Sequence, residues 1–195
     1  MAAFSRLVSR VVPLKIRDID TDQIIPARFL KTIDKEGLAA ALFADWRFDS
    51  DGAPIQSFAL NATDAQGAQI LLAGDNFGCG SSREHAVWAI AAGGFRAVVS
   101  SSFADIFRTN ALKNGLLPVA VDPATLEKLF ALRAADPALK LTIDLAYQSV
   151  LQPDGAKAIF PIDSFSKHCL LNGIDELGYL LSLEEKILAH ESRPA

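Results

Sequence analysis

Residues 74–85 read Gly-Asp-Asn-Phe-Gly-Cys-Gly-Ser-Ser-Arg-Glu-His, and this stretch decides the fold. The apolar run Ile70–Ala73 directly before it is typical of a short buried strand. Residues 81–92 predict a helix that begins at the two serines and has Glu84 in its first turn. The stretch therefore predicts a strand, a glycine-rich turn and a helix, which is how a parallel α/β unit begins.

The strand–helix alternation extends along most of the chain. We expect strands at 7–16, 97–99 and 116–121, helices at 103–112 and 123–135, and shorter, antiparallel strands at 139–146, 148–152 and 157–162. Residues 18–22 predict a polar turn, followed by a short extended piece at 23–26. The sequence thus favours a single α/β domain over residues 1–195. Residues 27–50 are expected to form a loop that is mobile in the isolated chain, and residues 174–195 a helical tail.

Composition excludes several classes of function. The chain has 195 residues, with 19 Lys and Arg against 23 Asp and Glu, for a formal net charge of -4. A mildly acidic chain without a basic stripe argues against a nucleic-acid or membrane-surface partner. The chain has no run of about 20 apolar residues, so the sequence predicts no membrane span. The first residues lack the apolar region of a secretion signal, so we expect a cytoplasmic protein.

Cysteine and histidine usage argues against a metal centre in this chain. The two cysteines, Cys79 and Cys169, allow one disulfide at most and indicate a reducing compartment. They cannot supply the three or four thiolates that an iron–sulfur cluster needs. The three histidines are scattered without ligand-like spacing. We therefore predict that the chain binds no metal.

The predicted helix start after the glycines has the character of an anion site. Free backbone N–H groups and the helix dipole favour negative charge there. Arg83 adds a guanidinium that can hold a carboxylate through two hydrogen bonds. A Ser81 hydroxyl in this place could lose its proton more easily, because the N–H groups would stabilise the oxyanion. The alternative is an ordinary serine cap with Glu84 on the helix dipole.

Other catalytic patterns fit less well. The stretch is neither a Walker loop, nor a dinucleotide-binding fingerprint, nor a nucleophile elbow. Cys79 could act as a nucleophile, but the sequence places no histidine for it. His85 shares a helix face with Ser81 and could orient the site or simply pack within the fold. The helical stripe that includes Phe103, Ile106 and Phe107 is expected to be core.

Four motifs in order resemble the aconitase superfamily, and most closely its isopropylmalate dehydratase small subunits. They lie at 20–26 (Asp-Thr-Asp-Gln-Ile-Ile-Pro), 76–86, 102–107 and 114–118. The resemblance covers nearly the whole chain. It implies a single swivelling β/β/α domain like the mobile C-terminal domain of aconitase. It also implies a hydro-lyase that isomerises 2-isopropylmalate to 3-isopropylmalate, by dehydration and rehydration, in leucine biosynthesis. The 4Fe–4S cluster would belong to a large partner subunit, and this chain would bind no cofactor.

The resemblance also implies roles for the catalytic side chains. Ser81 matches the base that takes a proton from carbon, and Arg83 matches a carboxylate-binding arginine beside it. Ser82 matches a second substrate contact, and Asp22 matches an acid that organises the site.

Further substrate contacts are expected in the segment that follows. Arg28 is a candidate for a second carboxylate-binding arginine. Leu30, Lys31 and Thr32 lie where relatives differ in the substrate side chain they accept, and Leu30 would suit an isopropyl group. Two alternatives stay open. One is the small subunit of a related dehydratase acting on homoaconitate, citraconate or a dimethylmalate, and the other is a non-catalytic anion-binding module.

Overall fold

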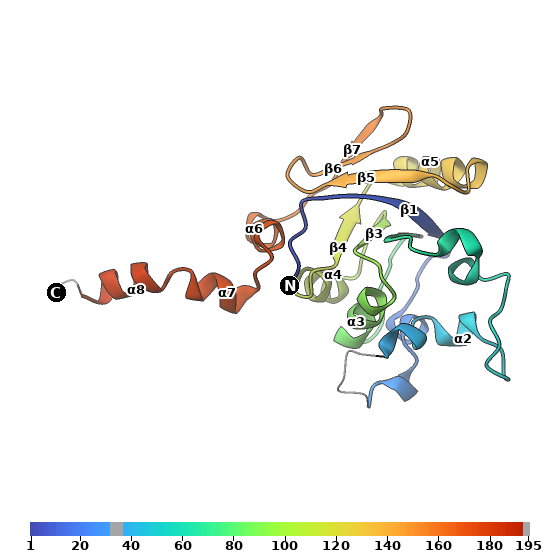
Figure 1. Cartoon of the computed structure of the whole chain (residues 1–195), viewed down its shortest axis with the longest axis horizontal. Coiled ribbons are helices and arrows are strands. Elements are labelled where there is room, and N and C mark those ends of the chain that lie inside the picture. The colour runs from blue at the N-terminus through green and yellow to red at the C-terminus, as the bar shows by residue number, and fades with distance from the viewer. Residues whose placement is uncertain (32–36, 193–195) are drawn as a thin grey trace.

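The computed structural model describes residues 1–31 and 37–192 of the chain (Figure 1). The strands are β1 (Arg6–Leu14), β2 (Ile70–Ala73), β3 (Ala97–Ser100), β4 (Leu117–Ala120), β5 (Lys140–Asp144), β6 (Ser149–Leu151) and β7 (Lys157–Ile159). The α-helices are α1 (Thr21–Ile24), α2 (Ala44–Arg47), α3 (Glu84–Ala92), α4 (Asp105–Lys113), α5 (Pro123–Ala135), α6 (Ser164–Asn172), α7 (Glu176–Leu181) and α8 (Glu184–Glu191). Short 3-10 helices lie at Ala27–Phe29, Leu38–Ala40, Ala59–Asn61 and Thr63–Ala65.

The seven strands form one curled sheet in the order β4-β3-β2-β1-β5-β6-β7 (Figure 1). Strand β1 pairs in parallel with β2, and β2–β3 and β3–β4 are also parallel. On its other edge β1 pairs antiparallel with β5, and the β5–β6 and β6–β7 pairs are antiparallel as well. The predicted α/β class, the parallel middle and the antiparallel later strands are confirmed.

Strand β2 is buried on both faces, which explains its continuous apolar sequence. Ile70 and Leu72 face one hydrophobic cluster, together with residues of α5. Leu71 and Ala73 face the other cluster, together with residues of α3 and α4. Because alternate residues of a strand point to opposite faces, each face of this strand must be apolar. The two helical layers therefore hold the carboxyl ends of the parallel strands in fixed positions.

Local sequence signals set several helix boundaries. Asp122 caps α5 by accepting a hydrogen bond from the Thr125 N–H at 2.9 Å, and Pro123 fills the first helical position. The predicted range 123–135 is confirmed. The predicted extended piece at 23–26 is wrong for its first two residues. Gln23 and Ile24 belong to α1, because Asp20 and Gln23 form a reciprocal capping box that starts this short helix.

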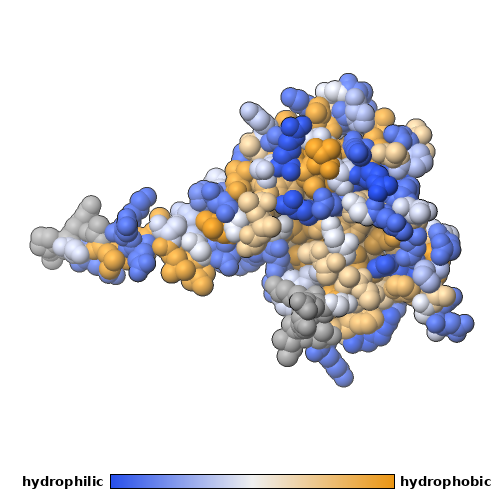
Figure 2. Space-filling model, in the orientation of Figure 1, coloured by the Kyte–Doolittle hydropathy of each residue, from blue (hydrophilic) through white to orange (hydrophobic). Residues whose placement is uncertain are grey.

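The C-terminal helices α7 and α8 project from the sheet domain (Figure 1). Their exposed apolar side chains are Leu177, Leu180, Leu181, Ile187 and Leu188, and Figure 2 shows apolar surface along this segment. The predicted helical tail is confirmed for residues 176–181 and 184–191. Within residues 1–31 and 37–192 there is no helix with the length and apolar character that crossing a bilayer requires.

Leu71→Ala tests the contribution of β2 to stability. The Leu71 side chain is fully buried in the cluster that supports α3 and α4. Its truncation should lower the free energy of unfolding by about 2–5 kcal/mol, from lost apolar burial and the cavity left behind. Urea unfolding followed by circular dichroism measures the change. Ile159→Ala, at a side chain that is 68% exposed on β7, is the control and should cost far less. Equal losses in the two variants would contradict this packing.

Candidate active site

Two loops lie side by side at the carboxyl ends of β1 and β2. One is residues 15–20, which lead into α1, and the other is residues 74–83, which lead into α3. Three backbone hydrogen bonds of 2.8–2.9 Å join them, donated by Asp18 to Asp75, by Gly78 to Ile19 and by Thr21 to Cys79. The position of one loop therefore fixes the position of the other.

Glycine allows the second loop to pass close to α4. The φ of Gly78 is +78°, in the left-handed region that glycine adopts at little cost. A Cβ atom at Gly78 would lie 2.2 Å from Cγ of Phe107. A side chain at this position would thus push the loop away from α4, and the serines that follow would move with it.

The start of α3 differs from the prediction. The helix begins at Glu84 with Arg83 as its N-cap residue, and no side chain among the described residues caps it. The expectation of a helix beginning at Ser81 and Ser82 is wrong. The hydroxyl of Thr21 donates a 2.8 Å hydrogen bond to the Ser81 carbonyl and holds the chain against α1. Arg83 has extended backbone angles, and the chain turns into the helix at Glu84.

The anion-binding character survives this shift of the helix start. Among the described residues, the backbone N–H groups of Ser81, Ser82, Arg83 and Glu84 meet no acceptor. The Ser81 hydroxyl likewise has no partner within the described chain, and Ser81 and Ser82 are exposed. Unpaired N–H groups before a helix attract negative charge. They could stabilise a substrate carboxylate or a serine oxyanion.

Arg83 and Asp22 form an ion pair across the two loops. The Arg83 side chain is 16% exposed and the Asp22 side chain is 54% exposed, so the guanidinium is the more enclosed partner. Helix α1 sets the position of Asp22, because Asp20 and Gln23 exchange hydrogen bonds of 2.8 and 2.9 Å around it. The sequence-predicted Ser81, Ser82, Arg83 and Asp22 are thus brought together.

A pocket of about 270 Å³ opens beside these groups. It is lined by Thr21, Gly78, Gly80, Ser81, Ser82, Arg83, Ala104, Asp105, Ile106 and Phe107. Ile106 is 53% exposed, so its assignment to the core is wrong. Its position on the apolar stripe of α4 predicts burial, but the Ile106 side chain lines this pocket. Ile106 is therefore a residue of the site that the sequence did not predict.

The other predicted substrate contacts lie elsewhere in the described structure. Arg28 forms a 2.6 Å ion pair with Asp45, which raises its pKa, and lines a separate pocket of about 620 Å³. Leu30 is half-buried against the core that includes α3, and Lys31 is exposed. Thr32 lies outside the described residues. None of the described three lines the Ser81 pocket.

Cys79 and His85 are accounted for by packing. The Cys79 thiol is half-buried and donates to the Asp18 carbonyl at 3.4 Å. Its burial, and then the nearby Asp20 and Asp18, raise its pKa, which disfavours the thiolate nucleophile. The His85 ring lies 4.7 Å from the Trp88 ring. Across residues 1–31 and 37–192, no cluster of three or more His, Cys, Asp or Glu could hold a metal ion.

Comparison with known proteins agrees with this geometry. Residues 1–124 match the model of the aconitase C-terminal domain family. The chain is 59% identical over 196 residues to a 3-isopropylmalate dehydratase small subunit of Roseiflexus sp. (strain RS-1), covering 100% of this chain and 96% of that protein. It is 57% identical over 192 residues to the protein of the same description in Chloroflexus aurantiacus (strain ATCC 29366 / DSM 635 / J-10-fl), covering 98% and 96%.

A solved structure agrees as well. The crystal structure of 3-isopropylmalate dehydratase from Methanocaldococcus jannaschii is similar at 27% identity and a TM-score of 0.66, covering 96% of this chain and 99% of that one. The fold and site define an aconitase-like C-terminal domain. Within that class, the chain belongs to the family of 3-isopropylmalate dehydratase small subunits.

Thiol alkylation tests the assignment of Cys79. Burial and the neighbouring carboxylates raise the pKa of Cys79. The pH at which its reaction with iodoacetamide reaches half the maximal rate should therefore be higher than for an unperturbed cysteine. Peptide mass spectrometry at a series of pH values separates Cys79 from Cys169. A half-maximal rate shifted to lower pH would instead indicate an activated nucleophile and contradict the packing role.

Proposed function

We propose that this chain is the small subunit of a hydro-lyase that interconverts 2-isopropylmalate and 3-isopropylmalate in leucine biosynthesis. The observation that carries the proposal is that Ser81, Ser82 and Arg83 line one pocket while Arg83 forms an ion pair with Asp22. The identity of up to 59% over the full chain to proteins of that description supports it. The reaction removes water across a carbon–carbon bond and adds it back with the opposite orientation.

Ser81 is the proposed base. In the dehydration direction its oxygen, as the alkoxide, takes the proton from the substrate carbon, and in the hydration direction the hydroxyl returns it. An alkoxide needs compensation of its charge. The unpaired N–H groups of residues 81–84 and the enclosed Arg83 guanidinium lie in the same loop and supply it.

Arg83 and Ser82 are proposed to bind the diacid, and Asp22 is proposed to orient Arg83. The guanidinium can hold a carboxylate in two parallel hydrogen bonds, and the Ser82 hydroxyl can donate a further one. The ion pair to Asp22 restrains the guanidinium of Arg83, a residue that lines the pocket. Asp22 then acts by positioning Arg83 and not by contacting the reacting carbon.

The substrate side chain is proposed to meet apolar surface. Ile106 lies at the pocket edge, and Leu30 stays a candidate from the resemblance. Arg28 is held by Asp45, so a role in carboxylate binding would require it to exchange that partner. The predicted contacts of Lys31 and Thr32 with the substrate stay predictions. A homoaconitate-type substrate would place a charged group against the apolar Ile106 side chain. The cost of this contact disfavours such a substrate.

The proposals for the cofactor and the partner rest on the small number of cysteines and on exposed apolar side chains. Two cysteines do not fit a 4Fe–4S cluster, and the described residues contain no cluster of three or more His, Cys, Asp or Glu that could hold a metal ion. We propose that a large partner subunit carries the cluster. Exposed apolar side chains on the projecting α7 and α8 are consistent with a polypeptide partner. The predicted mobility of residues 27–50, the single swivelling domain and the cytoplasmic location stay predictions.

Ser81→Ala tests the proposed base. Co-expressed anaerobically with its large subunit, the wild-type pair should convert 2-isopropylmalate, followed by the absorbance of the unsaturated intermediate. The variant pair should assemble equally well and lose activity by about 10²–10⁴-fold, because only the proton-transferring group is removed. Cys79→Ala is the matched control and should keep activity.

Each other outcome of this experiment has a distinct meaning. An active Ser81→Ala pair would contradict the serine mechanism. An assembled wild-type pair that converts citraconate or a dimethylmalate, and not 2-isopropylmalate, would move the substrate within the same architecture. Failure to assemble with any large subunit, with retained binding of citrate, would favour the anion-binding module.

Arg83→Lys tests carboxylate binding. Lysine keeps the charge but loses the planar pair of donors, so KM for the diacid should rise by about 10–100-fold with assembly intact. Initial-rate kinetics on the assembled enzyme measure the change. Arg6→Lys, the same change at an exposed position at the amino end of β1, is the control and should keep KM. An unchanged KM in Arg83→Lys would remove Arg83 from the substrate site.

A further inference from the structure

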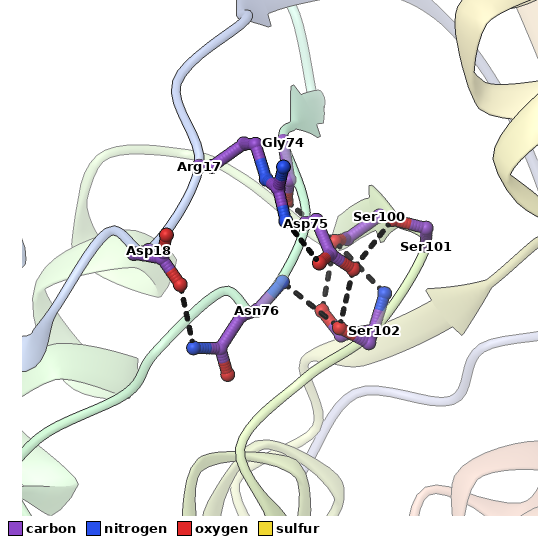
Figure 3. A network of polar contacts seen from close by, with 8 residues as sticks. All are labelled: Arg17, Asp18, Gly74, Asp75, Asn76, Ser100, Ser101 and Ser102. Atoms are coloured by element: carbon purple, nitrogen blue, oxygen red, sulfur yellow. Dashed lines mark hydrogen bonds and ion pairs between the residues drawn. The ribbon is translucent and has the colours of Figure 1, made fainter.

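Asp75 is the centre of a polar network at the carboxyl ends of three strands (Figure 3). Its Oδ1 atom accepts hydrogen bonds from the Ser101 hydroxyl at 2.8 Å and from the Ser102 hydroxyl at 2.7 Å. Its Oδ2 atom lies 3.3 Å from an Arg17 guanidinium nitrogen. One carboxylate thus binds a group from the loop after β1 and two groups from the loop after β3.

The neighbouring residues extend the same connections. The Asn76 N–H donates to the Ser102 hydroxyl at 2.9 Å, and the Asn76 side-chain amide donates to the Asp18 carboxylate at 2.8 Å. The Ser100 hydroxyl donates to the Gly74 carbonyl at 2.7 Å. Figure 3 shows these side chains converging between the three loops. The loop that carries Ser81 is therefore tied at its beginning to both neighbouring strand ends.

We propose that Asp75 is a positioning residue for the catalytic loop, holding Ser81 and Arg83 at the geometry the reaction needs. This inference rests on the proposed function. Asp75 does not line the Ser81 pocket, so it does not act on the substrate directly. It acts through residues 76–80, whose backbone pairs with residues 18–21 on the way to the serine.

The alternative is that Asp75 only contributes to general stability. Its side chain is 39% exposed, and surface ion pairs such as that with Arg17 contribute little to folding. The network instead concentrates its bonds on the loop that leads to the pocket. The two serines and then Arg17 lower the pKa of the carboxyl, so the charged form that accepts these bonds is present at neutral pH.

Two variants of Asp75 differ in how many of its hydrogen bonds they keep. Asp75→Ala removes every acceptor. Asp75→Asn keeps an oxygen that can occupy the Oδ1 position and accept from both serines, and it loses only the contact with Arg17. Asp122→Ala is the matched control, because it removes another exposed aspartate at a strand end that accepts from a hydroxyl and a backbone N–H.

The first readout is independent of activity. Cys79 lies in the held loop and is half-buried, whereas Cys169 is a buried residue of α6 and reports opening elsewhere. With iodoacetamide at fixed pH, Asp75→Ala should raise the alkylation rate of Cys79 by about tenfold, because the loop opens more often. The rate at Cys169 should not change. Asp75→Asn and Asp122→Ala should label at the wild-type rate within about twofold.

The second readout is kinetic, on the assembled enzyme. Asp75→Ala should lower kcat by about 10–100-fold with a smaller effect on KM, because misplacing a catalytic group by about 1 Å costs this much. Asp75→Asn should restore most of kcat, and Asp122→Ala should leave it unchanged. Wild-type Cys79 labelling and kcat in Asp75→Ala would overturn the proposal, and so would a loss of kcat without faster labelling.

Two further outcomes are separable. If Asp75→Ala does not fold, Ser101→Ala removes one bond and keeps the carboxylate. It should shift both readouts in the same direction by a smaller factor, and wild-type values in it would overturn the proposal. If the wild-type assembly turns over no diacid, the proposed function fails, while the labelling of Cys79 still decides whether Asp75 holds the loop.

Discussion

The backbone pairing between residues 18–21 and residues 75–79 is the interaction on which the candidate site depends. It joins loops that follow two parallel strands. Asp22 lies in α1, directly after one loop, and Ser81 and Arg83 lie in the other loop. The parallel register of β1 and β2 brings their ends together, and the burial of β2 on both faces holds the strand between two hydrophobic clusters.

The same constraint explains several residues that look unremarkable in isolation. Gly78 lacks a side chain because the loop passes against Phe107 while its N–H reaches the carbonyl of Ile19. Thr21 is buried and holds the Ser81 carbonyl. Within the part of the chain that the structure describes, the serine hydroxyls and the adjacent N–H groups stay unpaired at a pocket. The fold thus uses its hydrogen bonds to hold the loop and leaves the reactive groups free for a substrate.

Much of the fold could be predicted from sequence because its signals are local. The run Ile70–Ala73 and the Asp122–Pro123 helix start carry enough information in a few residues. The start of α3 could not be predicted, because the contact between Thr21 and Ser81 spans 60 positions and overrides the capping preference of serine. Two further features depend on tertiary contacts: the ion pair of Arg28 with Asp45 and the exposure of Ile106. Residue charge and hydrophobic periodicity do not predict such contacts.

The most direct measurement is a structure of the assembled enzyme with a non-reactive analogue of the diacid bound. The proposed mechanism predicts that the Ser81 oxygen lies about 3–3.5 Å from the carbon that loses its proton, with Arg83 on a carboxylate of the analogue. A complex in which Cys79 or His85 approaches that carbon instead, with Ser81 turned away, would contradict it.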